Sequence, residues 1–376
     1  MKVLSVVGAR PNLMKAAPFL RRERIKHVLV HTGQHHSAEM SGQFFDELCI
    51  RVPDYSLSIG GGSPGEQLGR TMIELEPVLS IENPDWVLVY GDVNAACASA
   101  IVAKRNGFLV AHVEAGLRSY DNSMPEEINR ILVDSICDLH FAPTKNAFHV
   151  LKSELLESVH FVGNIMIDTL EYERQAASQL PLMPRVPLLE ENGYVVLTLH
   201  RPSNVDDKDT LENILTTLSE LDIPIVFPVH PRTKANMQRF GITVALESPF
   251  IACEPLSYRQ MLRMNMSAKA ILTDSGGIQE EACVLGVPCV TLRRNTERPI
   301  TLRENGGTNR LAGDSRIPFH EWITGRGNGI LPCIYEALKE EKKPFRPPLW
   351  DGNTAERIEN LLRLNNHVWK SKRLSV

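Results

Sequence analysis

The feature of this sequence that most constrains its fold is a regular alternation of short apolar runs with longer segments of helical pattern. Six such runs occur in the first half of the chain, at residues 2–7, 28–32, 85–90, 109–113, 139–142 and 160–162. Parallel neighbouring strands need a crossover connection, which is usually a helix. Apolar runs that alternate with helical patterns therefore predict the strands of a parallel α/β sheet.

A second series of the same kind follows a segment that is rich in proline and charge. That segment, PLMPRVPLLEEN at 181–192, is predicted to be a linker. The apolar runs after it are 194–199, 225–229, 270–273 and 287–292. We therefore predict an α/β fold with two Rossmann-like domains that face each other across a cleft. The first would comprise residues 1–180 and the second 181–352, and a C-terminal helical segment, 353–376, would pack back on the first.

Composition narrows the class of protein. The 376 residues are enough for two domains, and 43% hydrophobic with 23% charged residues is typical of a soluble globular protein. The net charge of −4 provides no basic surface for a nucleic-acid partner. The seven cysteines include no CxxC pair or Cys/His cluster, which indicates reduced thiols and no zinc site. Without a membrane-spanning run or a signal-peptide pattern, we expect a cytoplasmic protein with no membrane partner.

Polar residues stand just past the ends of the predicted strands of the first domain. They are Arg10, Gln34, Asp92, Glu114, Thr144 and Asn164. Because the carboxyl ends of parallel strands meet at one edge of a sheet, we expect these side chains to share that edge. Glu114 carries the most weight, since a carboxylate at the end of an apolar strand points into the crevice where α/β proteins bind ligands.

Two further features of the first domain leave alternatives open. GARPNLMK at 8–15 turns from a strand into a helix and supplies Arg10 and Lys15, which form an anion site or simply face solvent. It is not a GxGxxG motif, so it does not support dinucleotide binding. Glu126 and Glu127 follow a proline at a helix start, where acids are ordinary residues. Glu126 is nevertheless also a candidate for acid–base chemistry.

The second domain offers a pattern suited to phosphate binding. Ser275, Gly276 and Gly277 lie between a predicted strand and a predicted helix. Glycines let the backbone approach a ligand closely, and the N–H groups of a helix N-terminus favour an anion. Glu280 and Glu281 follow in the predicted first turn, where acids would compete with a phosphate.

Other polar residues of the second domain are also candidates for ligand binding. Glu281 is a candidate acceptor for ribose hydroxyls, and Arg298 adds positive charge beside the glycines, as do Arg293 and Arg294. His200 ends the first strand of this domain and is expected to face the carboxylates of the other domain. Carboxylates opposite a phosphate site indicate proton transfer next to a phosphate group that leaves or anchors the substrate.

Seven motifs occur together in the order and spacing of one enzyme family. They are GARPNLMK at 8–15, GD at 91–92, HVEAGLR at 112–118, MPEEINR at 124–130, HR at 200–201, TDSGGIQEE at 273–281 and NTERP at 295–299. With these motifs the chain resembles the non-hydrolysing UDP-N-acetylglucosamine 2-epimerases. The resemblance implies a GT-B-like fold, similar to that of nucleotide-sugar glycosyltransferases.

The resemblance also implies an activity. It would be the interconversion of UDP-N-acetylglucosamine and UDP-N-acetylmannosamine, by elimination of UDP to a 2-acetamidoglucal and re-addition of UDP. No nicotinamide or other cofactor is implied, and no metal. The further implications are a homodimer, a UDP-sugar substrate and a role in cell-surface polysaccharide biosynthesis.

Individual residues acquire roles from the same resemblance. The implied acid–base residues are Asp92, Glu114 and Glu126, and His200 would assist them near the phosphates. The residues implied in binding the UDP-sugar are Arg10, Lys15, Leu256, Met261, Ser275, Gly276, Gly277, Glu281 and Arg298, with Leu256 and Met261 against the uracil. Those that match the site of a second, activating UDP-sugar are Gln34, Arg70 and His230.

The chain departs from the usual family pattern at several positions. Asn12 stands where a glutamate is common, and Met261 stands where an aromatic residue is common. HRPSN at 200–204 lacks a frequent glutamate, and GDVNA at 91–95 replaces a run of threonines. Four alternatives therefore stay open. They are an epimerase of a UDP-diacetamido-uronic acid, a hydrolysing 2-epimerase, a GT-B glycosyltransferase and a non-catalytic UDP-sugar sensor.

Overall fold

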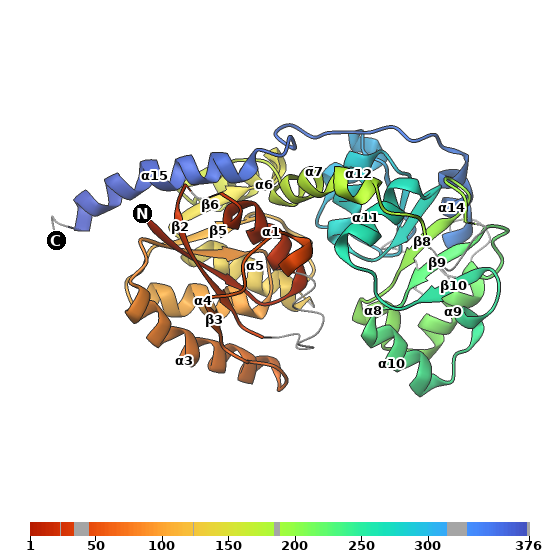
Figure 1. The fold of residues 1–376 in the computed structure, drawn as a ribbon, viewed down its shortest axis with the longest axis horizontal. Coiled ribbons are helices and arrows are strands. Elements are labelled where there is room, and N and C mark those ends of the chain that lie inside the picture. Colours follow the sequence, from red (N-terminus) through yellow and green to blue (C-terminus); the bar gives the residue numbers. More distant parts are fainter. Residues whose placement is uncertain (23, 34–44, 123, 184–188, 314–328, 374–376) are drawn as a thin grey trace. The chain divides into compact units, whose positions relative to one another are not determined.

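The computed structural model describes residues 1–22, 24–33, 45–122, 124–183, 189–313 and 329–373. The chain divides into two compact units, shown in Figure 1. Unit 1 comprises Met1–Tyr172 and Pro347–Val376, and unit 2 comprises Glu173–Arg346. The first division falls within helix α7 (Ile165–Ser178), upstream of the proline-rich segment at 181–192.

Unit 1 is built on a sheet of seven parallel strands in the order β3-β2-β1-β4-β5-β6-β7. They are β1 Lys2–Val7, β2 Lys26–His31, β3 Tyr55–Ser56, β4 Trp86–Tyr90, β5 Val110–Val113, β6 Leu139–Ala142 and β7 Val159–Phe161. The predicted parallel α/β sheet is confirmed, but the predicted number of six strands is wrong. The strand that was missed, β3, has only two residues and is partly exposed, so it produces no apolar run.

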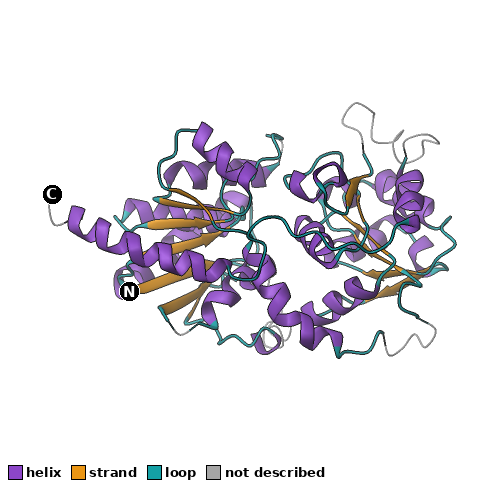
Figure 2. Cartoon of the chain, turned by 90° about the horizontal axis from the view of Figure 1, so that it is seen from above, coloured by secondary structure: helices purple, strands orange, loops and turns teal. Residues whose placement is uncertain are grey.

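Helices cover both faces of this sheet, as Figure 2 shows. They are α1 Arg10–Leu20, α3 Pro64–Glu82, α4 Asn94–Arg105, α5 Pro125–Ile136, α6 Lys145–Ser153, α7 and α15 Thr354–Arg373. Helix α4 lies against both α3 and α5. Its Ala95, Ala98 and Ala100 are fully buried, and their small side chains let α4 pack closely on the sheet and on its neighbours.

Unit 2 repeats this plan with six parallel strands in the order β10-β9-β8-β11-β12-β13. They are β8 Val195–Thr198, β9 Ile225–Pro228, β10 Phe250–Cys253, β11 Ala270–Thr273, β12 Cys289–Thr291 and β13 Asn309–Leu311. The helices are α8 Pro202–Val205, α9 Lys208–Leu218, α10 Pro231–Phe240, α11 Tyr258–Ser267, α12 Gly276–Leu285 and α14 Ile330–Lys339. The sequence did not predict β10 and β13, which form the two edges of the sheet and are only partly buried.

In each unit the strand order reverses beside the first strand in the sequence. The reversal lies between β1 and β4 in unit 1 and between β8 and β11 in unit 2. Connections leave such a point toward opposite sides of the sheet, and the crevice that opens at the carboxyl ends of the strands is where doubly wound proteins bind ligands. The topology therefore fixes one candidate edge in each unit before any side chain is considered.

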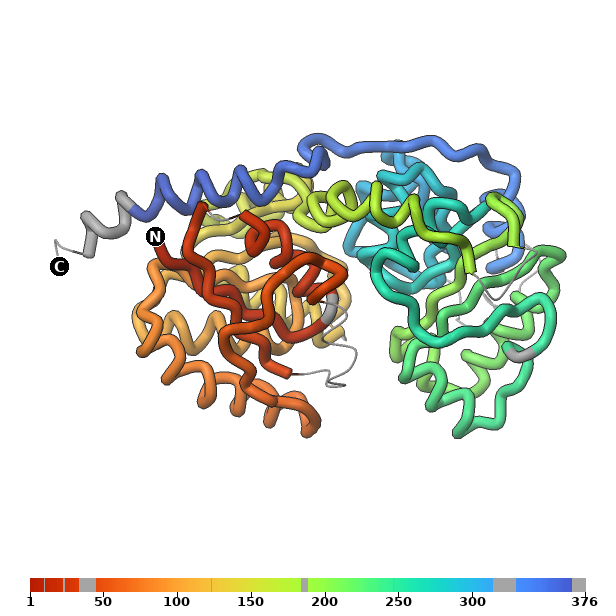
Figure 3. Tube along the Cα trace, viewed as in Figure 1, coloured from red at the N-terminus to blue at the C-terminus, as the bar shows by residue number. Residues whose placement is uncertain are grey.

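The C-terminal helix α15 belongs to unit 1, as predicted. The Asp168 carboxylate on α7 accepts hydrogen bonds from the N–H groups of Thr354 and Ala355, at 3.0 and 2.7 Å. Further along, Arg22 forms an ion pair with Glu359, 3.1 Å from Nε to Oε2. Figure 3 shows the same arrangement, with the C-terminal helix beside the N-terminal part of the chain in unit 1.

The described residues also give information on cysteines, metal sites and membrane-spanning helices. The seven cysteines are free, and Cys49 is exposed whereas Cys97, Cys283 and Cys289 are buried. Within the described ranges, no group of three or more His, Cys, Asp or Glu side chains is arranged to hold a metal ion. No helix in this part of the chain combines the length and apolar character needed to cross a membrane.

The contact of Asp168 with the start of α15 predicts a loss of stability on substitution. Asp168→Ala removes an anion that accepts two otherwise unpaired N–H groups at a helix N-terminus, so the free energy of unfolding should fall by about 1–2 kcal/mol. Urea denaturation of the full chain measures this change. Asp46→Ala, at an exposed aspartate of the same unit, is the control and should leave the midpoint within error. Equal midpoints for the two variants would contradict the role of Asp168.

Candidate active site

In unit 1, Glu114 directly follows β5 and lies at the carboxyl edge that the topology singles out. It has a φ of 76°, which is uncommon for a residue with a side chain, and it is only 5% exposed. Its carboxylate forms an ion pair with Lys15 of α1, which is 7% exposed. Lys15 is thus buried at this edge, and the alternative that it faces solvent is wrong. Strained backbone of this kind is concentrated at functional sites.

The approach of Lys15 to this edge depends on Gly91, which precedes Asp92. Gly91 has a φ of 64°, and a Cβ placed on it would lie 2.7 Å from the Lys15 ammonium. Asn12 fixes the same corner, because its side chain accepts a hydrogen bond from the Ala9 N–H at 3.1 Å and donates one to the Tyr90 carbonyl at 2.9 Å. A polar side chain at position 12 therefore joins the start of α1 to the end of β4.

Asp92 is held from the other side by helix α5. Its carboxylate pairs with Arg130, and the guanidinium of Arg130 also contacts Glu127, 2.7 Å from Nη1 to Oε2. Asn129 donates a hydrogen bond to the Asp92 carbonyl at 2.9 Å. No role was predicted for Arg130 or Asn129, although both lie within the MPEEINR motif. Helix α5 thus positions Asp92 through its own buried face.

The two adjacent acids of α5 differ in their surroundings. Glu127 is 1% exposed and accepts hydrogen bonds from the N–H groups of Ser119 and Tyr120, at 2.9 and 3.0 Å. Burial would raise the pKa of Glu127, but these hydrogen bonds and that from Arg130 outweigh it and hold the pKa below its usual value. Glu127 is therefore an ionised structural group. Glu126 is half-buried in the first turn of the same helix.

The other residues of unit 1 that were predicted to form the site lie as follows. Thr144 and Asn164 follow β6 and β7, so they lie at the carboxyl edge as expected. Arg70 of α3 donates a hydrogen bond to the Gly61 carbonyl, 2.7 Å from Nη2 to O. Arg10 begins α1, and its side chain is outside the described part of the structure. Gln34 lies outside the described residues.

In unit 2, the N-terminus of α12 lies at the corresponding edge of the sheet. Ser275 is the N-cap residue, and Gly276 and Gly277 form the first turn. A Cβ on Gly276 would lie 2.3 Å from Nη1 of Arg298, so glycine is needed for the guanidinium to approach the helix start. Arg298 also pairs with the buried Glu280, 2.9 Å from Nε to Oε1. The first turn of α12 contains no acid, so the expected competition of Glu280 with a phosphate is wrong.

Glu281 is buried one turn further along this helix. It is 4% exposed, and the Tyr258 hydroxyl donates a hydrogen bond to its carboxyl group at 2.9 Å. Burial raises the pKa of Glu281 to about 7, against the lowering effect of the Tyr258 hydrogen bond and with a further increase from Glu280. The Glu281 carboxyl group therefore gains or loses its proton near neutral pH. Tyr258 was not predicted from the sequence.

His200 lies beside α12 and is held by a buried carboxylate. Its Nδ1 is 2.7 Å from Oδ1 of Asp274, which is fully buried. Oδ2 of Asp274 accepts hydrogen bonds from the N–H groups of His200 and Arg201, both at 2.8 Å. Burial would raise the pKa of Asp274, but the charge and hydrogen bonds of His200, with the N–H groups, hold it below its usual value. Asp274 therefore fixes the orientation of the His200 ring.

The remaining predicted residues of unit 2 are His230, Leu256 and Met261, of which His230 lies next to His200. The rings of His200 and His230 are 5.6 Å apart between centroids, although the sequence assigned them to two different sites. His230 is the N-cap residue of α10, and its Nδ1 accepts a hydrogen bond from the Arg232 N–H at 3.2 Å. Leu256 and Met261 are half-buried and flank the start of α11.

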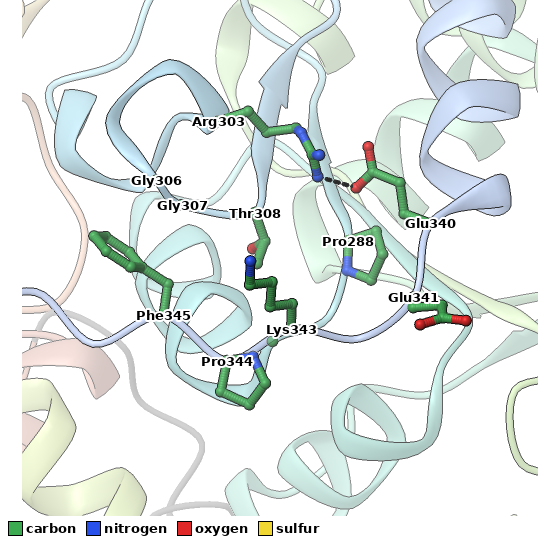
Figure 4. Close-up of a pocket in the computed structure, with 11 residues that line it drawn as sticks. Pro288, Arg303, Gly306, Gly307, Thr308, Glu340, Glu341, Lys343, Pro344 and Phe345 are labelled. Carbon is green, nitrogen blue, oxygen red and sulfur yellow. Dashed lines mark hydrogen bonds and ion pairs between the residues drawn. The ribbon is translucent and has the colours of Figure 1, made fainter.

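Unit 2 also contains a cavity of about 370 Å³ that lies apart from the predicted site residues. Its lining includes Pro288 and Thr308, which precede β12 and β13, so it is at the amino edge of the parallel sheet. Figure 4 shows Arg303 pointing toward Glu340 in this cavity, where the two form an ion pair. The cavity is therefore at the edge opposite the one that contains His200, and it takes no part in the candidate site.

The fold and the candidate site define a class of protein. Two doubly wound units, each with charged side chains at its topological switch point and one with a glycine-rich helix start, are typical of enzymes that bind nucleotides. Comparison of the sequence makes this specific. The family model for UDP-N-acetylglucosamine 2-epimerase matches residues 19–363, so the chain belongs to the UDP-N-acetylglucosamine 2-epimerase family.

The names of similar proteins agree with this membership. UDP-N-acetylglucosamine 2-epimerase of Methanococcus maripaludis is 40% identical over 372 residues, which are 96% of this chain and 98% of that protein. The protein of the same name from Methanocaldococcus jannaschii is 40% identical over 375 residues, covering 96% and 99%. UDP-2,3-diacetamido-2,3-dideoxy-D-glucuronate 2-epimerase of Pseudomonas aeruginosa is 40% identical over 308 residues, which are 79% of this chain and 84% of that protein.

Solved structures show the same fold. The crystal structure of the Methanocaldococcus jannaschii UDP-GlcNAc 2-epimerase in complex with UDP-GlcNAc and UDP matches with a TM-score of 0.86 and 39% identity, over 97% of this chain and 100% of that one. The Neisseria meningitidis enzyme bound to UDP-GlcNAc matches with a TM-score of 0.83 and 31% identity, over 96% and 100%. The GT-B-like fold predicted from the sequence is confirmed in its two parallel-sheet α/β domains.

The raised pKa of Glu281 predicts how stability changes with pH. The folded protein holds this proton to about pH 7, whereas the unfolded chain releases it near the usual value of 4.5. The contribution is therefore fully present below pH 4.5 and is lost as pH rises to about 7. At about 1.4 kcal/mol per unit of pKa, the loss is on the order of 3 kcal/mol.

Glu281→Gln removes this dependence and keeps an acceptor for Tyr258. Urea denaturation of both proteins at several values between pH 4.5 and pH 8 measures it. The unfolding free energy of the wild type should decline relative to that of the variant up to about pH 7, and the difference should then stay constant. Parallel pH profiles would show that Glu281 titrates normally.

Proposed function

We propose that this chain interconverts UDP-N-acetylglucosamine and UDP-N-acetylmannosamine through elimination and re-addition of UDP. Membership of the family and the names of its relatives support this activity. The observation that carries the proposal is the placement of Asp92 and Glu114 at the carboxyl ends of the adjacent strands β4 and β5, beside the switch point of unit 1. Each is paired with a cation, Arg130 or Lys15, that holds the carboxylate in place.

The chemistry requires more than one acid–base group. The hydrogen on C2 of the sugar has no neighbouring carbonyl and is poorly acidic, so cleavage of the bond between C1 and the phosphate oxygen must lead. A carboxylate then takes the C2 proton, and the electron pair forms a C1–C2 double bond. In the return direction a proton reaches the opposite face of C2 and UDP oxygen attacks C1. Asp92, Glu114 and Glu126 are the proposed acid–base residues.

We assign the nucleotide to residues of unit 2. The N-terminus of α12, with Ser275, Gly276 and Gly277, would accept the diphosphate beside Arg298. His200, together with Arg10 and Lys15, would act near the phosphates, where charge develops as UDP departs. Glu281 is assigned to the ribose hydroxyls. Leu256 and Met261 are assigned to the uracil ring, which they would contact through their apolar side chains.

A second candidate function is epimerisation of a UDP-diacetamido-uronic acid. The relative from Pseudomonas aeruginosa favours it, because its name specifies that substrate and it is as identical to this chain as the N-acetylglucosamine enzymes over the part it covers. The two functions share the reaction and differ in the substituents at C3 and C6. They are distinguished only by the substrate.

Several properties of the protein belong to the same proposal. We assign it to the cytoplasm and to cell-surface polysaccharide synthesis, without a cofactor. Self-association into a homodimer is supported by Ile128, Ile131 and Leu132 of α5, which are 50%, 43% and 44% exposed although they are apolar. Gln34, Arg70 and His230 are the proposed contacts of a second, activating UDP-sugar.

Incubation in D₂O with a panel of UDP-sugars tests the function. The proposal predicts UDP-N-acetylmannosamine with deuterium at C2 and no free sugar. Free N-acetylmannosamine with UDP would indicate a hydrolysing enzyme, and turnover only with an added acceptor would indicate a glycosyltransferase. Exchange restricted to a UDP-diacetamido-uronic acid would favour the second candidate. Binding of a UDP-sugar without any deuterium exchange would indicate a non-catalytic UDP-sugar sensor.

Glu114→Gln tests the proposed acid–base role directly. Loss of a carboxylate that transfers the C2 proton should lower the rate of deuterium exchange by about 10²–10⁴-fold. UDP should still bind, which calorimetry with UDP measures as an affinity close to that of the wild type. Exchange at the full rate in the variant would refute the role.

Gly276→Ala tests the nucleotide site. The added methyl would collide with the Arg298 guanidinium, so the Kd for UDP should rise by about tenfold or more, equivalent to about 1.4 kcal/mol. Gly65→Ala is the matched control, since a Cβ there meets nothing within 4 Å. Calorimetry of both variants with UDP provides the comparison. Equal affinities would place the diphosphate away from α12.

A further inference from the structure

His112 and Asp134 form a buried pair that the proposed reaction does not yet use. His112 lies in β5 and Asp134 in α5, and both are 0% exposed. Nδ1 of His112 is 2.7 Å from Oδ1 of Asp134, and its Nε2 is 2.9 Å from the Gly91 carbonyl oxygen. His112 belongs to the HVEAGLR motif, but neither residue was predicted to have a role.

Both ring nitrogens of the imidazole face a fixed partner. The Gly91 carbonyl oxygen can only accept a hydrogen bond, so Nε2 must carry the proton of this contact. Asp134 also accepts hydrogen bonds at Oδ2, from the Gly116 N–H at 3.1 Å and from Arg118 at 2.7 Å, and its Oδ1 faces Nδ1 of His112. The ring is therefore held between the Gly91 carbonyl and the Asp134 carboxyl group.

The surroundings of Asp134 favour its ionised form. Burial would raise the pKa of the Asp134 carboxyl, but the charges and hydrogen bonds of His112 and Arg118 outweigh it and hold that pKa below its usual value. His140, opposite His112 on the neighbouring β6, contacts the Asp134 backbone carbonyl instead, at 2.7 Å from Nε2. The carboxylate is thus directed to His112, Gly116 and Arg118.

The pair reaches both acid–base residues through the backbone. The Gly91 carbonyl belongs to the peptide group that connects Gly91 to Asp92, so its hydrogen bond to His112 fixes the plane of the peptide that precedes Asp92. Gly116, with a φ of 82°, lies two residues after Glu114, and its N–H is bound to Asp134. One buried carboxylate therefore constrains the backbone at Gly116 directly and at Gly91 through His112.

We infer that His112 and Asp134 are positioning residues for the proposed epimerase reaction. The imidazole orients Asp92 through the Gly91 carbonyl, and the carboxylate orients the imidazole and holds the turn that contains Glu114. Neither group contacts the substrate. The inference rests on the proposed function, and its consequences concern the rate of C2 exchange rather than the binding of the UDP-sugar.

Two substitutions of His112 separate the two hydrogen bonds. The amide nitrogen of glutamine reaches about the position of Nε2, and that of asparagine about the position of Nδ1. His112→Gln therefore keeps the donor to the Gly91 carbonyl, and His112→Asn loses it. A misplacement of a reacting group by about 1 Å costs about 10²-fold in rate. We expect kcat for C2 exchange to fall by about 10²-fold in His112→Asn and by no more than about tenfold in His112→Gln.

The measurements are kcat and KM for C2 deuterium exchange, with thermal unfolding of each variant. KM should stay within about threefold of the wild type in both variants, because a positioning group acts on the transition state. His140→Asn and His140→Gln are the matched controls, since His140 is buried on the adjacent strand and does not contact Gly91. These controls should not differ from each other in kcat.

Several results would contradict the inference or the proposed function on which it rests. Equal losses of kcat in the two His112 variants, or a larger loss in His112→Gln, would overturn it. If His112→Asn fails to fold, the ¹⁵N spectrum of His112 in the wild type provides the test, because Nε2 should carry a proton that is hydrogen-bonded to the Gly91 carbonyl. An Nε2 without a proton would overturn the inference. Absence of C2 exchange in the wild type with every UDP-sugar would instead refute the proposed function.

Discussion

In each unit, the candidate site residues depend on a buried carboxylate that is hydrogen-bonded to a histidine. Asp134 binds His112 in unit 1, and Asp274 binds His200 in unit 2, each at 2.7 Å. Both carboxylates also accept hydrogen bonds from backbone N–H groups at the carboxyl edge of their sheet. Desolvating such charges costs several kcal/mol, and pairing them repays this only with good geometry. Their hydrogen bonds to the carboxyl edges of the sheets indicate that they serve orientation more than stability.

The two units apply this interaction to different tasks. In unit 1 the histidine is fully buried and faces a backbone carbonyl, so it can act only through the chain. In unit 2 the side chain of His200 is 35% exposed, so the ring can meet a ligand while Asp274 holds it. Unit 1 accordingly places carboxylates next to cations, and unit 2 places a glycine-rich helix start next to an arginine. An elimination that expels a diphosphate and moves a proton requires both kinds of group.

The sequence was sufficient wherever a strand is fully buried. The runs 2–7, 139–142 and 270–273 were predicted with the observed bounds, and a residue such as Thr144, which follows the second of them, was placed at the correct edge. Edge strands such as β13 were missed because partial exposure removes the apolar pattern. Helix α5 explains why the site predicted from the sequence lacked some of its residues. Its buried face includes Arg130 and Asp134 beside a single valine, whereas Ile128, Ile131 and Leu132 are exposed, nearly the reverse of the usual pattern. Periodicity cannot reveal partners on such a face.

The central claim is that carboxylates of unit 1 exchange a proton at C2 while the bond from C1 to UDP breaks reversibly. Positional isotope exchange tests it most directly. The substrate is labelled with ¹⁸O in the bridging position between C1 and the β-phosphorus, and ³¹P spectroscopy follows the label. The account predicts that ¹⁸O spreads into the non-bridging positions of the β-phosphate as the epimers interconvert. Epimerisation with the label retained in the bridge would contradict it.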